Sequence, residues 1–289
     1  MNGESSPNGT VAILGGSGEL PIRLADRLRA RGRPHKILAF RGFSERALRD
    51  RADAVVGLLD LARIDACLQE WQPSCLTFAG GLRRPSPAAL IGAFSAFRSR
   101  EHVAAIVARG DDNILRGATE LLESKGFPLV GVRDLAPELL AEPGTHGAHQ
   151  PDEKAAASAA LGFRVLDAIA PFDIGQAVIV SAERVIAIEG PEGTDRMLKR
   201  ARPLNGRRWL GLRGGRGGVL VKGPKRGQDL RFDLPAIGPR TIGHAVRAGL
   251  DGIVIAAGLT LVLDQPGTIA AADRAGLFLV AVTPDENRS

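Results

Sequence analysis

Tyrosine is absent from the 289-residue sequence, and aromatic residues make up only 4% of it. Proteins that bind single-stranded nucleic acid stack its bases on aromatic side chains, so this composition disfavours such a ligand. The two cysteines, Cys67 and Cys75, are too few for a disulfide framework and too isolated for a zinc site. They are typical of small core residues in a protein from a reducing compartment.

Long apolar runs and an N-terminal leader are also missing. No charged segment followed by an apolar stretch opens the chain, and no apolar run is long enough to cross a bilayer. We therefore expect a cytoplasmic protein. Hydrophobic residues at 44% and charged residues at 24% are close to globular averages, and a length of 289 residues favours two domains.

Basic residues are concentrated in one segment of the sequence. Between Arg196 and Arg231 there are twelve Lys and Arg residues and a single acid, Asp229. This excess indicates an anionic partner or a solvated surface. Nucleic acid, a phosphorylated metabolite and anionic lipid headgroups are the three candidates, and the shortage of aromatic residues disfavours the first.

Strand-like and helix-like segments alternate through the first half of the sequence. Short apolar strands are predicted at 10–14, 35–40, 52–58, 74–81 and 127–132, and helices at 19–32 and 115–126. This alternation predicts an α/β domain, a mostly parallel Rossmann-like layer. A polar, Pro- and Gly-containing segment at 141–154 indicates a linker, so the first domain is expected at 1–146 and the second at 147–289.

The second half predicts a distinct α/β domain with a mixed sheet. A helix is expected at 154–170, followed at 176–190 by two strands that a short polar turn joins, which favours antiparallel pairing. The tail alternates again, with helices at 241–249 and 270–276 and strands at 251–257 and 277–282.

The glycine turn GGSGEL, at 15–20, comes between a predicted strand and a predicted helix. Backbone N–H groups at such a turn can bind a phosphate, although a tight turn without a ligand explains it equally well. Pro21 stands where the dinucleotide fingerprint requires its third glycine, and no ribose-binding acid follows the second strand. NAD is therefore disfavoured, although Arg41 at that position leaves NADP open.

Two further turns carry charged residues. AGGLRRP, at 79–85, follows a predicted strand and includes Arg84, so in a parallel sheet it is expected at the same edge as GGSGEL. Asp111 and Asp112 in RGDDNILR precede a predicted helix. They are explained either by helix capping or by binding of a hard cation.

The charged residues after position 188 suggest phosphate chemistry. Lys222, Lys225 and Arg231 could neutralise phosphate oxygens, and Asp233, in the apolar run RFDLPAIG, could orient a water or bind Mg²⁺. From the residues alone, a turn before Leu-Pro or pairing with Arg231 explains Asp233 better than catalysis does.

These motifs, taken together, resemble the LpxI-type UDP-2,3-diacylglucosamine pyrophosphatase family. The resemblance extends from about residue 10 to about residue 283 and rests on the following segments in the family's order: LGGSGELP, FAGGLRRP, RGDDNILR, FDIGQAVIV, IEGPEGTDRML, VKGPKRGQDLRFDLPAIGPRTI and AGLDGIVIAAG. A match of several motifs is much more specific than any one of them.

The resemblance implies hydrolysis of UDP-2,3-diacylglucosamine to UMP and 2,3-diacylglucosamine 1-phosphate, with Mg²⁺, in lipid A biosynthesis of Gram-negative bacteria. It further implies a homodimer whose lipid-linked UDP-sugar lies between the two domains, and water attack on the sugar-side phosphorus. Since the substrate is diacylated, we expect an apolar channel between the domains and peripheral contact with the inner face of the inner membrane. Nucleic acid is not an expected partner.

The resemblance also assigns site residues. Asp233 falls on the catalytic Asp of the family's R-x-D-L-P-x-I-G motif. Positions expected near the substrate are Gly18, Arg84, Gly110, Asp111, Gln176 and Asp195, together with the phosphate-binding candidates Lys222, Lys225 and Arg231. The predicted Mg²⁺ ligands are Glu192, Asp195 and Asp233.

Three alternative functions remain open at this stage. The first is a hydrolase of another nucleotide-sugar or nucleoside diphosphate ester, and the second a non-catalytic sugar-nucleotide or phospholipid-binding protein. Nucleic-acid binding through residues 196–231 is the third, and it predicts steep salt dependence.

Overall fold

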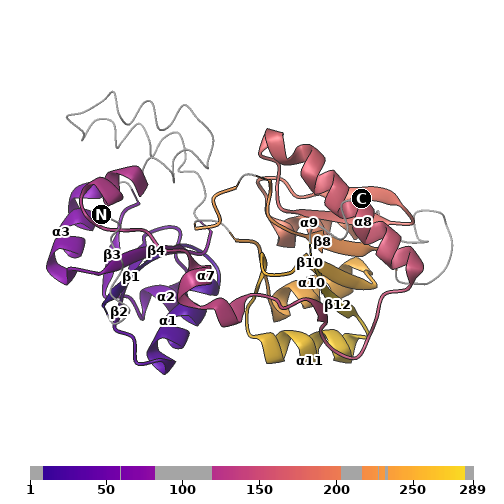
Figure 1. Cartoon of the computed structure of the whole chain (residues 1–289), viewed down its shortest axis with the longest axis horizontal. Helices are drawn as coiled ribbons and strands as arrows, with labels where there is room; N and C mark the ends of the chain where they lie inside the picture. Colours follow the sequence, from indigo (N-terminus) through magenta and orange to yellow (C-terminus); the bar gives the residue numbers. More distant parts are fainter. Residues whose placement is uncertain are drawn as a thin grey trace. The chain divides into compact units, whose positions relative to one another are not determined.

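The chain forms two compact units (Figure 1) in the computed structural model, which describes residues 9–58, 60–81, 119–202, 217–226, 228–231 and 234–283. The N-terminal unit comprises Met1–Ala136 with Arg231–Asp233, and the C-terminal unit comprises Pro137–Leu230 with Leu234–Ser289. Arg231 therefore belongs with the N-terminal unit although it follows much of the C-terminal unit in the sequence. Both units are α/β, as the sequence predicted.

A parallel sheet of four strands forms the centre of the N-terminal unit, in the order β3-β2-β1-β4. All five residues of β1 are buried, so its sequence, VAILG, shows no polar alternation. The elements are β1 (Val11–Gly15), α1 (Leu20–Ala30), β2 (His35–Phe40), α2 (Arg46–Arg49), β3 (Ala54–Val56), α3 (Leu61–Trp71), β4 (Cys75–Ala79) and α7 (Val132–Leu135).

Helix α1 shows how the sequence specifies this layer. Pro21 lies in its first turn, where the missing N–H has no helical partner to lose. Leu24 and Leu28, four residues apart, are fully buried on one face. Each buried leucine contributes about 1.5–3 kcal/mol relative to an exposed one.

The C-terminal unit contains a mixed sheet of six strands in the order β5-β12-β10-β8-β6-β7. Strands β8, β10 and β12 run parallel, β6 and β7 form the antiparallel pair that the sequence predicted, and β5 pairs antiparallel with β12. The strands are β5 (Gly144–Thr145), β6 (Ala177–Ser181), β7 (Arg184–Ile188), β8 (Val219–Lys222), β10 (Gly252–Ala256) and β12 (Phe278–Val282). A separate parallel pair consists of β9 (Ala236–Ile237) and β11 (Leu261–Val262).

Helices cover both faces of this sheet (Figure 1). Residues of α9 (Thr194–Ala201), α10 (Pro239–Ala248) and α11 (Gln265–Ala275) pack in a core with Leu220 of β8. Residues of α8 (Glu153–Ile169) pack in a second core with Val221. Successive residues of a strand point to opposite faces, so these neighbours in β8 place the two cores on either side of the sheet.

Helix α8 and the 3-10 turn η2 (Ala170–Phe172) correct one expectation from the sequence. Within the described residues, the stretch Glu153–Phe172 is long and apolar enough to cross a membrane by length and composition. Its Ala155, Gly162 and Phe163 are nevertheless buried against the sheet. Length and composition do not distinguish such a core helix from a membrane span.

The segment predicted as a linker, 141–154, is also different in the structure. Its residues form β5, the His146 N–H donates to the Leu279 carbonyl at 2.8 Å, and the Ala148 N–H donates to Asp273 Oδ1 at 2.8 Å. The linker prediction was wrong because polar residues, Pro and Gly also mark the edge strand of a sheet. The strand predicted at 127–132 is reduced to a single bridge between Leu129 and Leu76.

Candidate functional site

Two glycine turns meet at the carboxyl edge of the N-terminal sheet. They follow β1 and β4, which are neighbours, as expected from the sequence. Ser17 and Gly81 exchange backbone hydrogen bonds of 2.9 and 3.0 Å, and the Ser17 hydroxyl donates to the Gly81 carbonyl at 3.0 Å. The chain leaves β1 toward β2 on one side and returns in β4 on the other, so these turns lie at the switch point where α/β sheets bind ligands.

Backbone contact at this edge leaves no room for larger residues. Gly80 has a φ of +85°, and a Cβ there would lie 2.3 Å from the Ser17 carbonyl oxygen. Gly18, a predicted substrate contact, has a φ of +90° and open space around it. The N–H groups of the first helical turn lack partners within a helix. Gly18 and the start of α1 therefore offer backbone donors to an anion.

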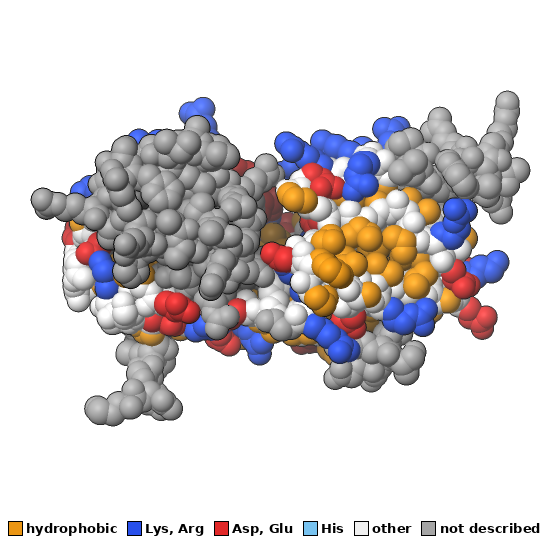
Figure 2. Space-filling view, turned by 90° about the horizontal axis from the view of Figure 1, so that it is seen from above, with side chains coloured by type: hydrophobic (Ala, Val, Ile, Leu, Met, Phe, Trp, Pro, Cys, Tyr) orange, Lys and Arg blue, Asp and Glu red, His pale blue; other side chains and the backbone are white. Residues whose placement is uncertain are grey.

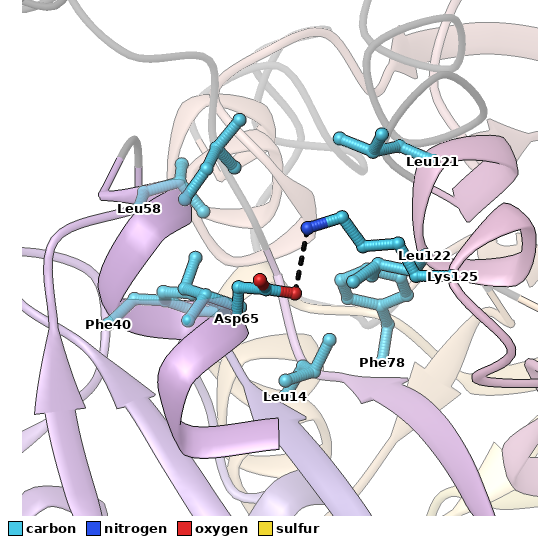
Figure 3. A pocket seen from close by; sticks show the side chains of 10 residues that line it. Leu14, Phe40, Leu58, Asp65, Phe78, Leu121, Leu122 and Lys125 are labelled. Atoms are coloured by element: carbon cyan, nitrogen blue, oxygen red, sulfur yellow. Dashed lines mark ion pairs between the residues drawn. The ribbon is translucent and has the colours of Figure 1, made fainter. Parts of the chain in front are cut away.

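A small apolar cavity of about 80 Å³ lies beside this sheet in the N-terminal unit (Figure 3). Leu14, Phe40 and Phe78 line it from the strands, and Asp65 and Lys125 form an ion pair of 2.7 Å at it. Apart from this charged pair, the lining of the cavity is apolar. It holds only a few heavy atoms, far fewer than an acyl chain contains.

In the C-terminal unit, a buried polar network lies at the carboxyl end of β8. Lys222 ends this strand and is 7% exposed, and its Nζ donates to Thr194 Oγ1 at 2.7 Å. The Thr194 hydroxyl donates to Glu189 Oε1 at 2.7 Å, and the Gln176 N–H donates to Glu189 Oε2 at 3.0 Å. The structure thus brings together two predicted substrate contacts, Gln176 and Lys222, through Thr194 and Glu189.

Gly175 allows the backbone before β6 to lie close to the backbone of Glu189. Its φ is +38°, and a Cβ at this position would lie 2.2 Å from the Glu189 carbonyl oxygen. The D-I-G-Q motif therefore requires glycine immediately before Gln176. Any side chain at this position would push the Gln176 N–H away from the Glu189 carboxylate.

Asp195, at the start of α9, is surrounded by basic side chains. Arg240 Nε lies 2.8 Å and His244 Nε2 3.6 Å from Asp195 Oδ2. Burial lowers the pKa of His244 below its ordinary value, and three nearby cations do so too, against the opposing effect of the Asp195 carboxylate. Arg247 Nη2 lies 3.0 Å from His244 Nδ1. Because a guanidinium only donates, the His244 proton is assigned to Nε2, toward Asp195.

The remaining described candidates are held in ion pairs. Glu192 accepts from Arg200 Nη2 at 2.8 Å, and this hydrogen bond lowers the pKa of the Glu192 carboxyl. The Lys225 ammonium pairs with Asp173, and Arg231 Nη1 lies 3.1 Å from Glu123 Oε1 of the N-terminal unit.

An open hollow of about 530 Å³ lies at the same carboxyl edge of the C-terminal sheet. Ala257 and Gly258, which follow β10, and Thr283, which follows β12, contribute to its lining. Since β8, β10 and β12 are parallel neighbours, the hollow and Lys222 lie at the same end of these strands. Ligands of α/β proteins gather at this end.

Comparison with known proteins gives the same two-unit division. Residues 10–139 match the LpxI N-terminal domain, and residues 142–280 match the LpxI C-terminal domain. The chain belongs to the LpxI family. It is 35% identical over 280 residues to the UDP-2,3-diacylglucosamine pyrophosphatase LpxI of Caulobacter vibrioides, covering 96% of this chain and 98% of that protein.

Four residues that the LpxI resemblance assigns lie outside the described residues. They are Arg84, Gly110, Asp111 and the candidate catalytic Asp233. Their predicted roles stay predictions.

The predicted Mg²⁺ ligands Glu192 and Asp195 both lie in the described part of the chain. This part contains no group of three or more His, Cys, Asp or Glu side chains arranged to hold an ion. One carboxylate oxygen of Glu192 and one of Asp195 already form an ion pair with an arginine, so these two residues do not make a Mg²⁺ site by themselves. The prediction that they bind Mg²⁺ with Asp233 remains a prediction.

Thr194, His244 and Glu189 were not among the site residues predicted from the sequence. Glu189 and Thr194 flank the turn that carries Glu192, so their position close to the site was visible in the sequence. The network that joins them to Lys222 depends on the antiparallel pairing of β6 with β8, in which Ala177 lies opposite Lys222. No local pattern encodes this register.

Proposed function

We propose that this LpxI-family chain hydrolyses UDP-2,3-diacylglucosamine to UMP and 2,3-diacylglucosamine 1-phosphate in lipid A biosynthesis. The observation that carries the proposal is the match, over nearly the full length of both chains, to a UDP-2,3-diacylglucosamine pyrophosphatase. Both LpxI domains are present in order. The glycine turns and the buried Lys222 are features that suit a diphosphate.

The reaction requires one bond to form and one to break. In our proposal the oxygen of water forms a bond to the sugar-side phosphorus, and the bond from that phosphorus to the bridging oxygen breaks. The bond's electron pair leaves on the phosphate of UMP, and the water loses a proton. We assign Asp233 to orienting this water, and Lys222 to neutralising charge on a diphosphate oxygen.

We also propose that the reaction requires Mg²⁺. This ion usually keeps several waters and binds through one or two carboxylates plus substrate phosphates, so a cluster of three protein ligands is not required. When bound, it neutralises charge on phosphoryl oxygens. Removal of divalent ions with EDTA is expected to abolish turnover, and restoring Mg²⁺ to recover it. Full activity in EDTA contradicts the proposal.

The proposed substrate carries two acyl chains and is therefore a membrane lipid. For this reason we propose that the chain makes peripheral contact with an anionic membrane surface. Figure 2 shows a contiguous group of hydrophobic side chains, with Lys, Arg, Asp and Glu side chains around it, on the face of the C-terminal unit where α8 lies. Phe172, directly after α8, is 73% exposed. Such apolar residues with basic neighbours suit an interfacial contact.

Cosedimentation with anionic and zwitterionic vesicles tests this contact. We expect the parent chain to sediment with anionic vesicles and Phe172→Ser to do so several-fold less. Equal binding of both proteins contradicts it. The predicted homodimer is a separate matter, which sedimentation velocity tests by giving about twice the monomer mass of 30.4 kDa.

Product analysis tests the proposed reaction. Purified chain with Mg²⁺ is expected to release UMP and phosphorylated lipid in equal amounts from UDP-2,3-diacylglucosamine. Lipid-free UDP-N-acetylglucosamine is expected to be a poor substrate and a weak competitor. Efficient cleavage of the lipid-free sugar favours a general nucleotide-sugar hydrolase, and binding without products favours a non-catalytic binding protein.

A further inference from the structure

We propose that Thr194 and Glu189 are positioning residues, which hold the Lys222 ammonium in place for an oxygen of the substrate diphosphate. This inference rests on the proposed function, because it assigns the anion that Lys222 meets. It adds two residues whose side chains act through Lys222.

Lys222 is placed as an anion-binding residue of an α/β sheet would be. It lies opposite Ala177 of β6 and Ile255 of β10, so its strand is central in the sheet. At 7% exposure, its side chain has left water, which lysine rarely does without a partner. Its ammonium is therefore held at the carboxyl edge of the sheet in surroundings that strengthen an interaction with an anion.

Thr194 fixes the direction of this ammonium. A hydroxyl has one proton to donate, and Thr194 gives it to Glu189 Oε1 at 2.7 Å. Toward Lys222, at 2.7 Å, the hydroxyl can then only accept. An ammonium has three donors, and Thr194 is the one acceptor recorded for Lys222 among the described residues. Among the described residues no other acceptor contacts this ammonium, and we assign its two further N–H groups to the ligand.

Glu189 ties the network to the backbone. Its side chain accepts from the Gln176 N–H at 3.0 Å, and its own N–H donates to the Ala177 carbonyl at 2.9 Å. The carboxylate therefore joins the end of β7, the start of β6 and the start of α9. At 9% exposure, it also supplies a negative charge near the buried ammonium. Charged hydrogen bonds of this kind are the stronger ones in proteins.

The experiment is a double-mutant cycle on binding of inorganic pyrophosphate, measured by titration calorimetry on the full chain. The variants are Thr194→Val, which loses the hydroxyl at nearly constant volume, Lys222→Met, and the two combined. We expect the single variants to weaken binding about 10-fold each, and the double variant to bind no more than about twofold more weakly than Lys222→Met. Such non-additivity shows that Thr194 acts through Lys222.

Two further variants separate positioning from a structural role. Thr194→Ser keeps the hydroxyl and is expected to bind pyrophosphate within about twofold of the parent chain. Thr268→Val removes another buried hydroxyl of the same unit, which donates to the Leu263 carbonyl at 2.7 Å, far along the chain from Lys222. It is expected to lower the melting temperature without weakening pyrophosphate binding.

The inference is overturned by any of three results: additive effects in the cycle, parental binding by Thr194→Val, or no pyrophosphate binding by the parent chain. UMP release from UDP-2,3-diacylglucosamine is measured separately on the same proteins. A parent chain that hydrolyses this substrate but shows additive effects overturns this inference alone. Coupled pyrophosphate binding without hydrolysis supports it and overturns the proposed reaction.

Discussion

The two units place their candidate anion-binding groups at the same kind of sheet edge but build them differently. In the N-terminal unit the groups are backbone atoms, positioned by glycines that let two turns touch. In the C-terminal unit they are the side chains of Lys222, Thr194 and Glu189, removed from water and bonded to one another. A backbone site requires glycines, because a side chain at these positions would separate the two turns. A side-chain site requires that each buried polar group keep its hydrogen-bond partner.

The largest expected effect tests the backbone half of this comparison. Gly80→Ala places a Cβ against the Ser17 carbonyl at positive φ, so we expect a loss of about 2–4 kcal/mol of stability. In a Trp209→Phe background, Trp71 of α3 is the remaining tryptophan and reports unfolding of this unit by fluorescence. Gly57→Ala is the control, because the nearest described atom to its Cβ would be the Asp60 Cβ, at an ordinary contact distance of 3.6 Å. Equal stability of the two variants contradicts the backbone interpretation.

The next effect tests the side-chain half. Glu189→Ala leaves the Gln176 N–H and the Thr194 hydroxyl without their buried acceptor, which is expected to cost about 2–3 kcal/mol. Hydrogen exchange is expected to accelerate in peptides covering the start of β6. Glu153→Ala, which removes an exposed carboxylate of the same unit, serves as the control. Unchanged exchange in Glu189→Ala means that the network does not order this edge.

A smaller effect sharpens the difference between the units. Ser17→Ala removes the hydrogen bond from the Ser17 hydroxyl to the Gly81 carbonyl and leaves the backbone bonds between Ser17 and Gly81 in place. We therefore expect a loss of about 1 kcal/mol or less, measured by the same Trp71 fluorescence. A loss as large as that of Gly80→Ala indicates that side chains, too, hold this edge.

The smallest effect concerns Glu192 and depends on pH. The hydrogen bond from Arg200 lowers the pKa of Glu192 below its ordinary value of 4.5. The pair therefore stabilises the fold above that pH and ceases to do so as pH falls through the lower folded pKa. Glu192→Gln is expected to cost under about 1 kcal/mol at neutral pH, and this cost is expected to vanish as pH falls through the folded pKa of Glu192. A difference in melting temperature that grows toward acid pH contradicts this pairing.

Much of the fold could be predicted from the sequence. Apolar segments such as VAILG and HKILAF predict buried strands because parallel sheets bury both faces. The short turn between β6 and β7 predicts their antiparallel pairing, which the structure confirms. The sequence did not reveal β5, because two polar residues at a sheet edge have no periodic pattern.

The candidate site was predicted in part. The glycine turns, Gln176 and Lys222 were identified from motifs, and the family to which the motifs pointed is confirmed by both domain matches. The contacts of Glu189 with Thr194 and of His244 with Asp195 could not be predicted, because only the tertiary fold shows which side chains meet. Asp233 was assigned by resemblance, and its position lies outside the described residues.

Release of UMP from UDP-2,3-diacylglucosamine with Mg²⁺, measured for the parent chain beside Asp233→Ala, tests the central claim most directly. Asp229→Ala, four residues earlier in the same basic segment, is the matched control. We expect steady release by the parent chain and by Asp229→Ala, and a loss of at least about 100-fold for Asp233→Ala. Near-parental turnover by a folded Asp233→Ala protein, or no UMP from a folded parent chain, contradicts the account.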